Sequence, residues 1–217
     1  AASAYGLESG DMLLRFGAAN VAPNSSTGLL WADGANSGLG DDLLKIDAGS
    51  ALGVSFTYMF TPVVGLEILA ASPFTHDIQA RGELGTLLGF DDFGATKQLP
   101  PTISLQFYPL GNSESAWQPY VGLGVNYTWF HDEDLSAQTE SALGVSDKDF
   151  NLKDSVGMAV TLGVDWFFSE SWFVNASLMW ADINTEATID NTVLGDLKLT
   201  DINVDPLVYR LNVGYRF

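Results

Sequence analysis

Apolar and polar residues alternate along most of this chain with a period of two, the period of a β-strand. The C-terminal segment 207–217 shows the pattern most clearly. One face of this segment is wholly apolar and aromatic: Leu207, Tyr209, Leu211, Val213, Tyr215 and Phe217. The other face carries Val208, Arg210, Asn212, Gly214 and Arg216. Such a strand fits a soluble protein with its apolar face inward, or a transmembrane barrel with that face against lipid.

Segments of this kind recur along the chain and predict eight strands: 10–21, 51–60, 64–71, 102–108, 121–129, 156–166, 172–181 and 207–217. Their connections alternate between short and long. The long ones are rich in Gly, Asp, Ser and Asn and are expected to be loops: 23–45, 79–96, 131–153 (with a short helix near 135–143) and a polar stretch around 190–196. An even number of strands with this alternation is typical of outer-membrane barrels, which have short periplasmic turns and long extracellular loops. We therefore predict one domain, 1–217, formed by an eight-stranded antiparallel transmembrane β-barrel.

The composition of the two faces decides the orientation of the predicted strands. One face is apolar in every strand, whereas the other carries Gly, Ser, Thr, Asn and Gln together with five charged residues: Arg15, Glu67, Asp165, Arg210 and Arg216. A soluble barrel would place charges outside and apolar residues inside. Aromatic residues also gather near the strand ends, with Tyr58, Phe60, Phe107, Trp166, Trp172, Tyr215 and Phe217 at one end and Trp129 and Trp180 at the other. This arrangement predicts two interfacial aromatic girdles and an apolar face turned to lipid.

Composition and charge exclude several classes of function. A formal net charge of −18 argues against nucleic acid as a partner, and the absence of cysteine excludes a disulfide scaffold. We find no nucleophile elbow, no zinc-ligand spacing and no phosphate loop, so neither an enzyme nor a cofactor or metal site is predicted. His76 and His131 lie beside acidic residues and are expected at the surface. The acidic external loops suit weak Ca²⁺ or Mg²⁺ binding that bridges to lipopolysaccharide phosphates.

The inward face predicts what the lumen contains. An eight-stranded barrel is barely wide enough for its own side chains or one small ligand. Five inward apolar residues are candidates for a hydrophobic lumen, with the first two forming a constriction above the short turns: Leu69, Met179, Leu13, Met59 and Phe173. Plain core packing is the alternative interpretation. The five inward charges are expected to pair with one another, Arg210 and Arg216 with Glu67 and Asp165, and to plug the lower lumen; a role in selectivity is the alternative.

Three prolines interrupt neighbouring strands of the predicted barrel. Pro100 and Pro101 are consecutive in the fourth strand, and Pro73 lies at a similar level in the third. Proline has no backbone N–H, and consecutive N–H groups point to opposite neighbours, so this pair removes a donor toward each adjoining strand. The cluster predicts a local opening of the barrel wall. The alternative is that these prolines merely end the sheet at the outer interface.

Several segments resemble a known family: LGVSFTYMF, VGLEILAASPFTHDI, KQLPPTISLQFYP, PYVGLGVNYTWF, DSVGMAVTLGVDW, VNASLMWADINTEA and VDPLVYRLNVGYRF. They are similar, in order, to the OmpW family of Gram-negative outer-membrane proteins, which includes OprG-like and AlkL-like members. The resemblance implies passive uptake of small hydrophobic molecules, a hydrophobic gate near Leu69 and Met179, and a lateral opening at the prolines. It also implies that Phe217 serves as the terminal aromatic residue used in assembly.

The partners expected from this interpretation are outer-membrane lipid, lipopolysaccharide and small hydrophobic solutes, with the protein acting as a monomer in the outer membrane. Two other functions stay open at this point. One is a channel for small polar solutes such as small amino acids. The other is a surface or receptor protein with no role in transport.

Overall fold

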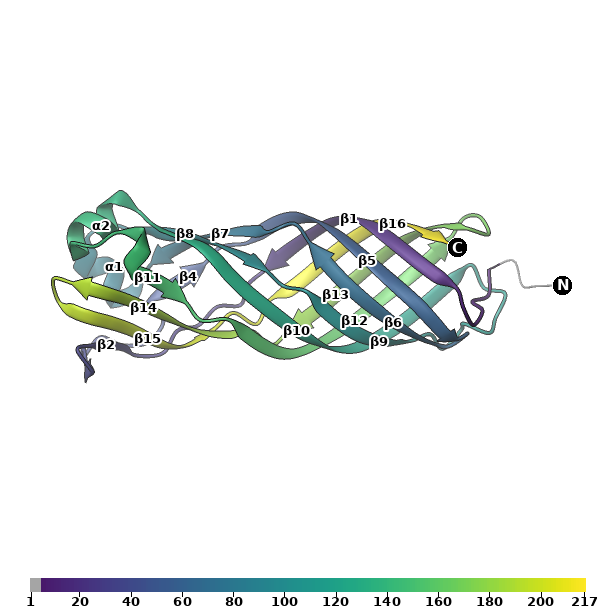
Figure 1. Ribbon diagram of the computed structural model, residues 1–217, viewed down its shortest axis with the longest axis horizontal. Coiled ribbons are helices and arrows are strands. Elements are labelled where there is room, and N and C mark those ends of the chain that lie inside the picture. The colour runs from purple at the N-terminus through teal and green to yellow at the C-terminus, as the bar shows by residue number, and fades with distance from the viewer. Residues whose placement is uncertain (1–4) are drawn as a thin grey trace.

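The computed structural model describes residues 5–217. Long antiparallel strands close into a barrel whose axis runs along the molecule (Figure 1). In chain order the eight are β1 (Met12–Ala22), β5 (Gly49–Thr61), β6 (Val64–Ala71), β9 (Thr102–Phe107), β10 (Trp117–Leu135), β12 (Ser155–Phe167), β13 (Trp172–Ala181) and β16 (Leu207–Arg216). β16 pairs with β1 from Leu13↔Arg216 to Ala22↔Leu207 and closes the barrel. The predicted eight-stranded antiparallel barrel is confirmed.

Side-chain exposure follows the predicted alternation. In β16, Leu211 is 62% exposed whereas Arg210 next to it is 5% exposed. The exposed aromatic residues form the two girdles, with Tyr58, Phe60, Phe107, Trp166, Trp172 and Phe217 at the short-turn end and Trp129 and Trp180 at the other. An apolar outer surface is stable against lipid and costly against water, so this surface is the membrane-facing wall.

The long connections, expected as loops, contain strands and short helices that form an ordered extension beyond the barrel (Figure 1, left). One sheet of the extension continues from the barrel through the upper half of β10. It adds β8 (Asp92–Leu99), β7 (Phe74–Ala80) and β4 (Leu44–Ile46), with α1 (Gly82–Leu88) at the tip of the β7–β8 hairpin.

A second sheet faces the first across the extension. Its strands are β11 (Phe150–Leu152), β14 (Asn184–Thr192), β15 (Gly195–Asn203), β2 (Leu30–Ala32) and β3 (Ala35–Asn36), in that order. The helix expected near 135–143 is α2 (Ala137–Leu143), where the Ser136 side chain accepts the Thr139 N–H, and the short 3₁₀ turn η1 (Asp147–Asp149) follows. No helix among residues 5–217 is long and apolar enough to cross a membrane.

The inward and outward faces of the strands in the extension are reversed relative to those of the barrel, so the barrel pattern did not predict these strands. In β15, Leu197 and Leu199 are buried while Asp196 and Lys198 face outward. Here the apolar side chains point inward and the polar ones outward, as in a water-soluble domain. The extension therefore surrounds an apolar interior, whereas the barrel presents its apolar face to lipid.

Candidate functional site

A buried ion pair crosses the lower part of the barrel interior. Arg15, 1% exposed, projects inward from β1 and donates from Nε and Nη2 to the two carboxylate oxygens of Asp165 at 3.1 and 2.7 Å. Its Nη1 donates to Thr57 Oγ1 at 2.8 Å and its Nη2 to Tyr108 Oη at 2.7 Å. Bidentate arginine–carboxylate pairs are among the strongest polar contacts in proteins. Arg15 is thus held on several sides.

A second pair completes this layer. Glu67 Oε1 lies 3.6 Å from both Arg15 Nη1 and Arg210 Nη1, and Arg210 Nε donates to Ser177 Oγ at 2.9 Å. We call Arg15, Glu67, Asp165 and Arg210 the charge layer; its two arginines balance its two carboxylates. Four of the five predicted lumen charges therefore meet as expected.

Arg216 does not occupy the predicted place. Its Nη1 lies 3.8 Å from Asp11 and donates to the Gly6 carbonyl oxygen at 2.7 Å, at the short-turn rim. Its guanidinium also lies 5.0 Å from the centre of the Phe167 ring. The prediction that Arg216 pairs with Glu67 or Asp165 is wrong, because the last residue of β16 lies at the rim of the barrel.

The predicted hydrophobic lumen residues fall on two sides of the charge layer. Leu13, Met59 and Phe173 belong to the floor, a buried cluster completed by Leu7, Tyr108, Tyr120 and Phe167. Leu69 and Met179 lie in a different cluster that includes Ala19, Val21 and Val208 and continues into the extension. Their inward direction agrees with the sequence pattern, but the five residues do not form one gate.

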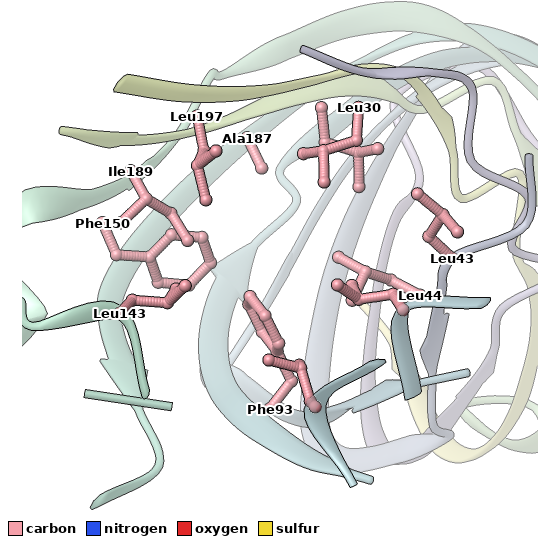
Figure 2. A pocket seen from close by; sticks show the side chains of 12 residues that line it. Leu30, Leu43, Leu44, Phe93, Leu143, Phe150, Ala187, Ile189 and Leu197 are labelled. Carbon is pink, nitrogen blue, oxygen red and sulfur yellow. The ribbon is translucent and has the colours of Figure 1, made fainter. Parts of the chain in front are cut away.

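An apolar cavity of about 40 Å³ lies inside the extension (Figure 2). It is lined by Leu30, Leu43, Leu44, Leu84, Leu88, Phe93, Leu143, Phe150, Ala187, Ile189, Leu197 and Leu199. A second cavity of about 20 Å³ shares Leu44 and Phe150 with the first and also touches His76 and Gln98. The two cavities therefore adjoin. Sequence reasoning missed them, although the alternation of Leu197 and Leu199 with polar neighbours was a usable signal.

His76 is buried, contrary to the prediction of a surface histidine. Its Nδ1 donates to the Asp47 carbonyl oxygen at 2.7 Å, so Nε2 is the acceptor for the Gln98 side-chain amide at 2.9 Å. Burial lowers the pKa of His76, against the opposing effect of its bond to Asp47. Residues 5–217 contain no group of three or more His, Asp or Glu side chains that could hold a metal ion.

The backbone ladder of the barrel wall is interrupted at the prolines. The β6–β9 pairing ends at Leu69↔Thr102, and the β7–β8 pairing begins at Phe74↔Gln98. Within the described chain, no ladder pairing joins 70–73 to 99–101. The three prolines thus lie between strands, not inside the third and fourth strands as predicted, because proline cannot donate to a ladder. We call this interruption the wall break.

The wall break lies at the outer membrane interface. Trp129, an exposed residue of the outer girdle, pairs with Leu99 on the strand that leads into Pro100. On the inner side, Leu69 and Phe74 flank the break and belong to the apolar cluster that extends from the cavities. The break therefore separates an apolar interior from the lipid-facing surface at one level of the wall.

Comparison with known proteins agrees with this architecture. The profile of the OmpW family matches residues 8–217. The chain is 39% identical to outer membrane protein W of Vibrio cholerae, over 100% of this chain and 93% of the relative. It is similar to the crystal structure of OprG from Pseudomonas aeruginosa, with a TM-score of 0.86, 38% identity and 98% of each chain covered. It is also 25% identical to outer membrane protein AlkL of Ectopseudomonas oleovorans, over 100% of this chain and 86% of that protein. With its lipid-facing barrel, inward charge layer and matching profile, this chain belongs to the OmpW family of Gram-negative outer-membrane β-barrel proteins.

Proposed function

We propose that this protein is a passive channel through which small hydrophobic molecules enter from outside the cell. The observation that carries the proposal is the apolar interior of the extension. It holds two adjoining cavities, and many of their wall residues belong to the same buried cluster as Leu69 and Met179. Transfer from water into such a path costs an apolar solute little free energy. A polar solute would lose its hydrogen bonds to water and gain none in return.

The floor of the path favours a sideways exit. Below Leu69 the lumen is filled by the charge layer and by the floor, and the bidentate Arg15–Asp165 pair crosses it. A hydrophobic solute would have to disrupt these buried ion pairs to continue downward, which is unfavourable. The wall break lies above them, level with the outer girdle. Release through the break into the membrane is therefore the exit that we propose, with Pro73, Pro100 and Pro101 at its edges.

The family supports the same assignment. The resemblance described above implies uptake of small hydrophobic molecules, and the AlkL relative aligns over this whole chain. A channel for small polar solutes would need polar groups along its entry path through the extension. The lining of the larger cavity is apolar at every position, so we favour the hydrophobic solute.

The proposal is tested by filling the larger cavity. Cells that make the wild-type protein, a variant or no protein are mixed with the apolar dye N-phenylnaphthylamine. The fluorescence of this dye rises when the dye enters a membrane, and the rate of the rise is measured. Ala187 lines the cavity, and Ala187→Trp should slow the rise at least about fivefold, the kinetic equivalent of about 1 kcal/mol. The matched control is Thr188→Trp on the outer face of the same strand, which should keep the wild-type rate.

Two results would reject the proposal. Equal dye uptake by cells with and without the protein would exclude hydrophobic transport. Uptake of glycine that depends on the protein and is insensitive to Ala187→Trp would instead favour a channel for small polar solutes.

A further inference from the structure

Asn126 contacts Pro100 and Pro101, two of the three prolines of the wall break, from strand β10. It projects inward from β10 and is 1% exposed. Its amide nitrogen lies 2.9 Å from Thr102 Oγ1, 3.3 Å from the Pro100 carbonyl oxygen and 3.4 Å from the Pro101 carbonyl oxygen. Its own carbonyl oxygen accepts the Thr128 hydroxyl at 2.6 Å. Both the nitrogen and the oxygen of the Asn126 side-chain amide therefore have hydrogen-bond partners beside the wall break.

These contacts set the direction of the proline carbonyls. In a regular strand, successive carbonyl groups point to opposite neighbours. Here the Pro100 and Pro101 carbonyl oxygens both lie toward β10, since both contact Asn126 and Pro101 also accepts the Tyr127 N–H at 3.0 Å. Neither carbonyl is therefore directed at β6 or β7 across the break.

The other edge of the break is bonded in a similar way. Ser72 lies between β6 and β7 and donates its N–H to the Leu52 carbonyl oxygen at 2.8 Å. Its hydroxyl accepts the Leu52 N–H at 3.2 Å. Ser72 thus bonds to β5, on the side away from Pro100 and Pro101. Each edge of the break is attached to the strand behind it.

We propose that Asn126 is the positioning residue of the lateral opening, with Ser72 as its counterpart on the facing edge. This inference rests on the proposed function. A wall that had merely frayed would leave backbone polar groups unpaired near lipid, which is costly. The Asn126 amide is a partner for the two proline carbonyls, and the Ser72 hydroxyl ties its segment to Leu52 of β5, so each edge is held back from the other.

The test separates exit from binding. Purified protein is reconstituted into lipid vesicles, and two quantities are measured with the same apolar dye: the dye bound at equilibrium and the rate of its release into the bilayer. Asn126→Leu removes the donor and Asn126→Asp replaces it with an acceptor of similar size. Each should slow release about tenfold, consistent with losing one or two hydrogen bonds, and leave bound dye unchanged.

Two further variants make the test specific. Asn126→Gln keeps an amide donor and should recover most of the release rate. Thr161→Val, at another buried inward position on the neighbouring strand β12, should behave as wild type in both measurements. Should Asn126→Leu fail to fold, Ser72→Ala at an exposed position replaces it and should slow release about threefold, as expected for one hydrogen bond.

The outcomes distinguish the two proposals. Wild-type release rates in Asn126→Asp and Ser72→Ala would overturn the role of Asn126 and Ser72. Equal losses of binding and release in Asn126→Asp would do the same, because they would indicate damage to the path as a whole. No release from the wild-type protein would instead reject the proposed function.

Discussion

The lower barrel and the extracellular extension solve opposite packing problems with the same chain. The barrel has an apolar outside and a charge layer inside it, above the apolar floor. The extension has a largely apolar interior and a polar outside. Strand β10 passes through both regions. In its lower half Leu123 and Val125 face lipid, and in its upper half Leu135 is buried while Asp134 is exposed. The register shifts between His131 and Asp134 at this change, and Asp132 there has a left-handed backbone with φ of 50°.

The two interiors differ because their surroundings differ. The solvent outside the wall changes from lipid to water along β10, and the apolar side chains move from the outer to the inner face with it. The buried apolar cluster runs from the extension down to Leu69 and Met179, above the charge layer. Substitutions in the two interiors should therefore differ in their effect on stability.

The charge layer should be the more sensitive of the two interiors. Arg15→Met leaves the fully buried Asp165 carboxylate without its bidentate partner, and should lower the free energy of unfolding by about 3–5 kcal/mol. Urea unfolding in lipid vesicles measures the change. The double variant Arg15→Met/Asp165→Leu removes both charges and should recover much of the loss. Equal losses in the single and double variants would contradict this account.

The apolar interior should respond through cavity volume. Phe93 lines the larger cavity and packs edge-to-face on Phe150, with ring centres 6.2 Å apart. Phe93→Ala should lower the free energy of unfolding by about 3 kcal/mol, and the enlarged space should hold more dye. The matched control is Leu87→Ala on α1, where the side chain is 67% exposed and the change should stay within about 0.5 kcal/mol. Equal effects at the two positions would argue against a packed apolar interior.

A pH effect is expected at the boundary between the two regions. Burial lowers the pKa of His76, so the folded protein binds this proton more weakly than the unfolded chain does. The contribution of neutral His76 to the free energy of unfolding is therefore fully present above the ordinary histidine pKa of about 6.5. It is lost as the pH falls below that value. Unfolding midpoints at a series of pH values measure the effect. It should disappear in His76→Gln and persist in His131→Gln; persistence in both would exclude His76 as its source.

The smallest effect is expected on the outer surface of the extension. Lys198 Nζ lies 2.9 Å from Glu186 Oε2, and both side chains are more than a third exposed. The hydrogen bond from Lys198 lowers the pKa of Glu186. Lys198→Ala should cost at most about 1 kcal/mol of unfolding free energy, and less at high salt, since water and ions screen the pair. A loss comparable to that of Arg15→Met would remove the contrast between surface and buried ion pairs.

The sequence alone determined which residues face inward in the barrel. Arg15, Glu67, Asp165 and Arg210 were all assigned correctly, because alternation is a property of the extended backbone and needs no knowledge of the partner strand. The same alternation identified the lipid-facing surface and the strand that closes the barrel. The resemblance to the OmpW family came from the same segments.

Which inward groups meet depends on closure of the barrel and cannot be read from the alternation. Arg15 and Asp165 are 150 residues apart and make contact because the closed barrel brings β1 and β12 to the same level. Arg216 lies on the same face of its strand as Arg210 but reaches the rim, since strand register fixes height in the lumen. The apolar cavities and the contacts of Asn126 with Pro100 and Pro101 likewise arise between segments far apart in the chain. Backbone geometry sets the direction of each side chain, and closure of the sheet sets its neighbours.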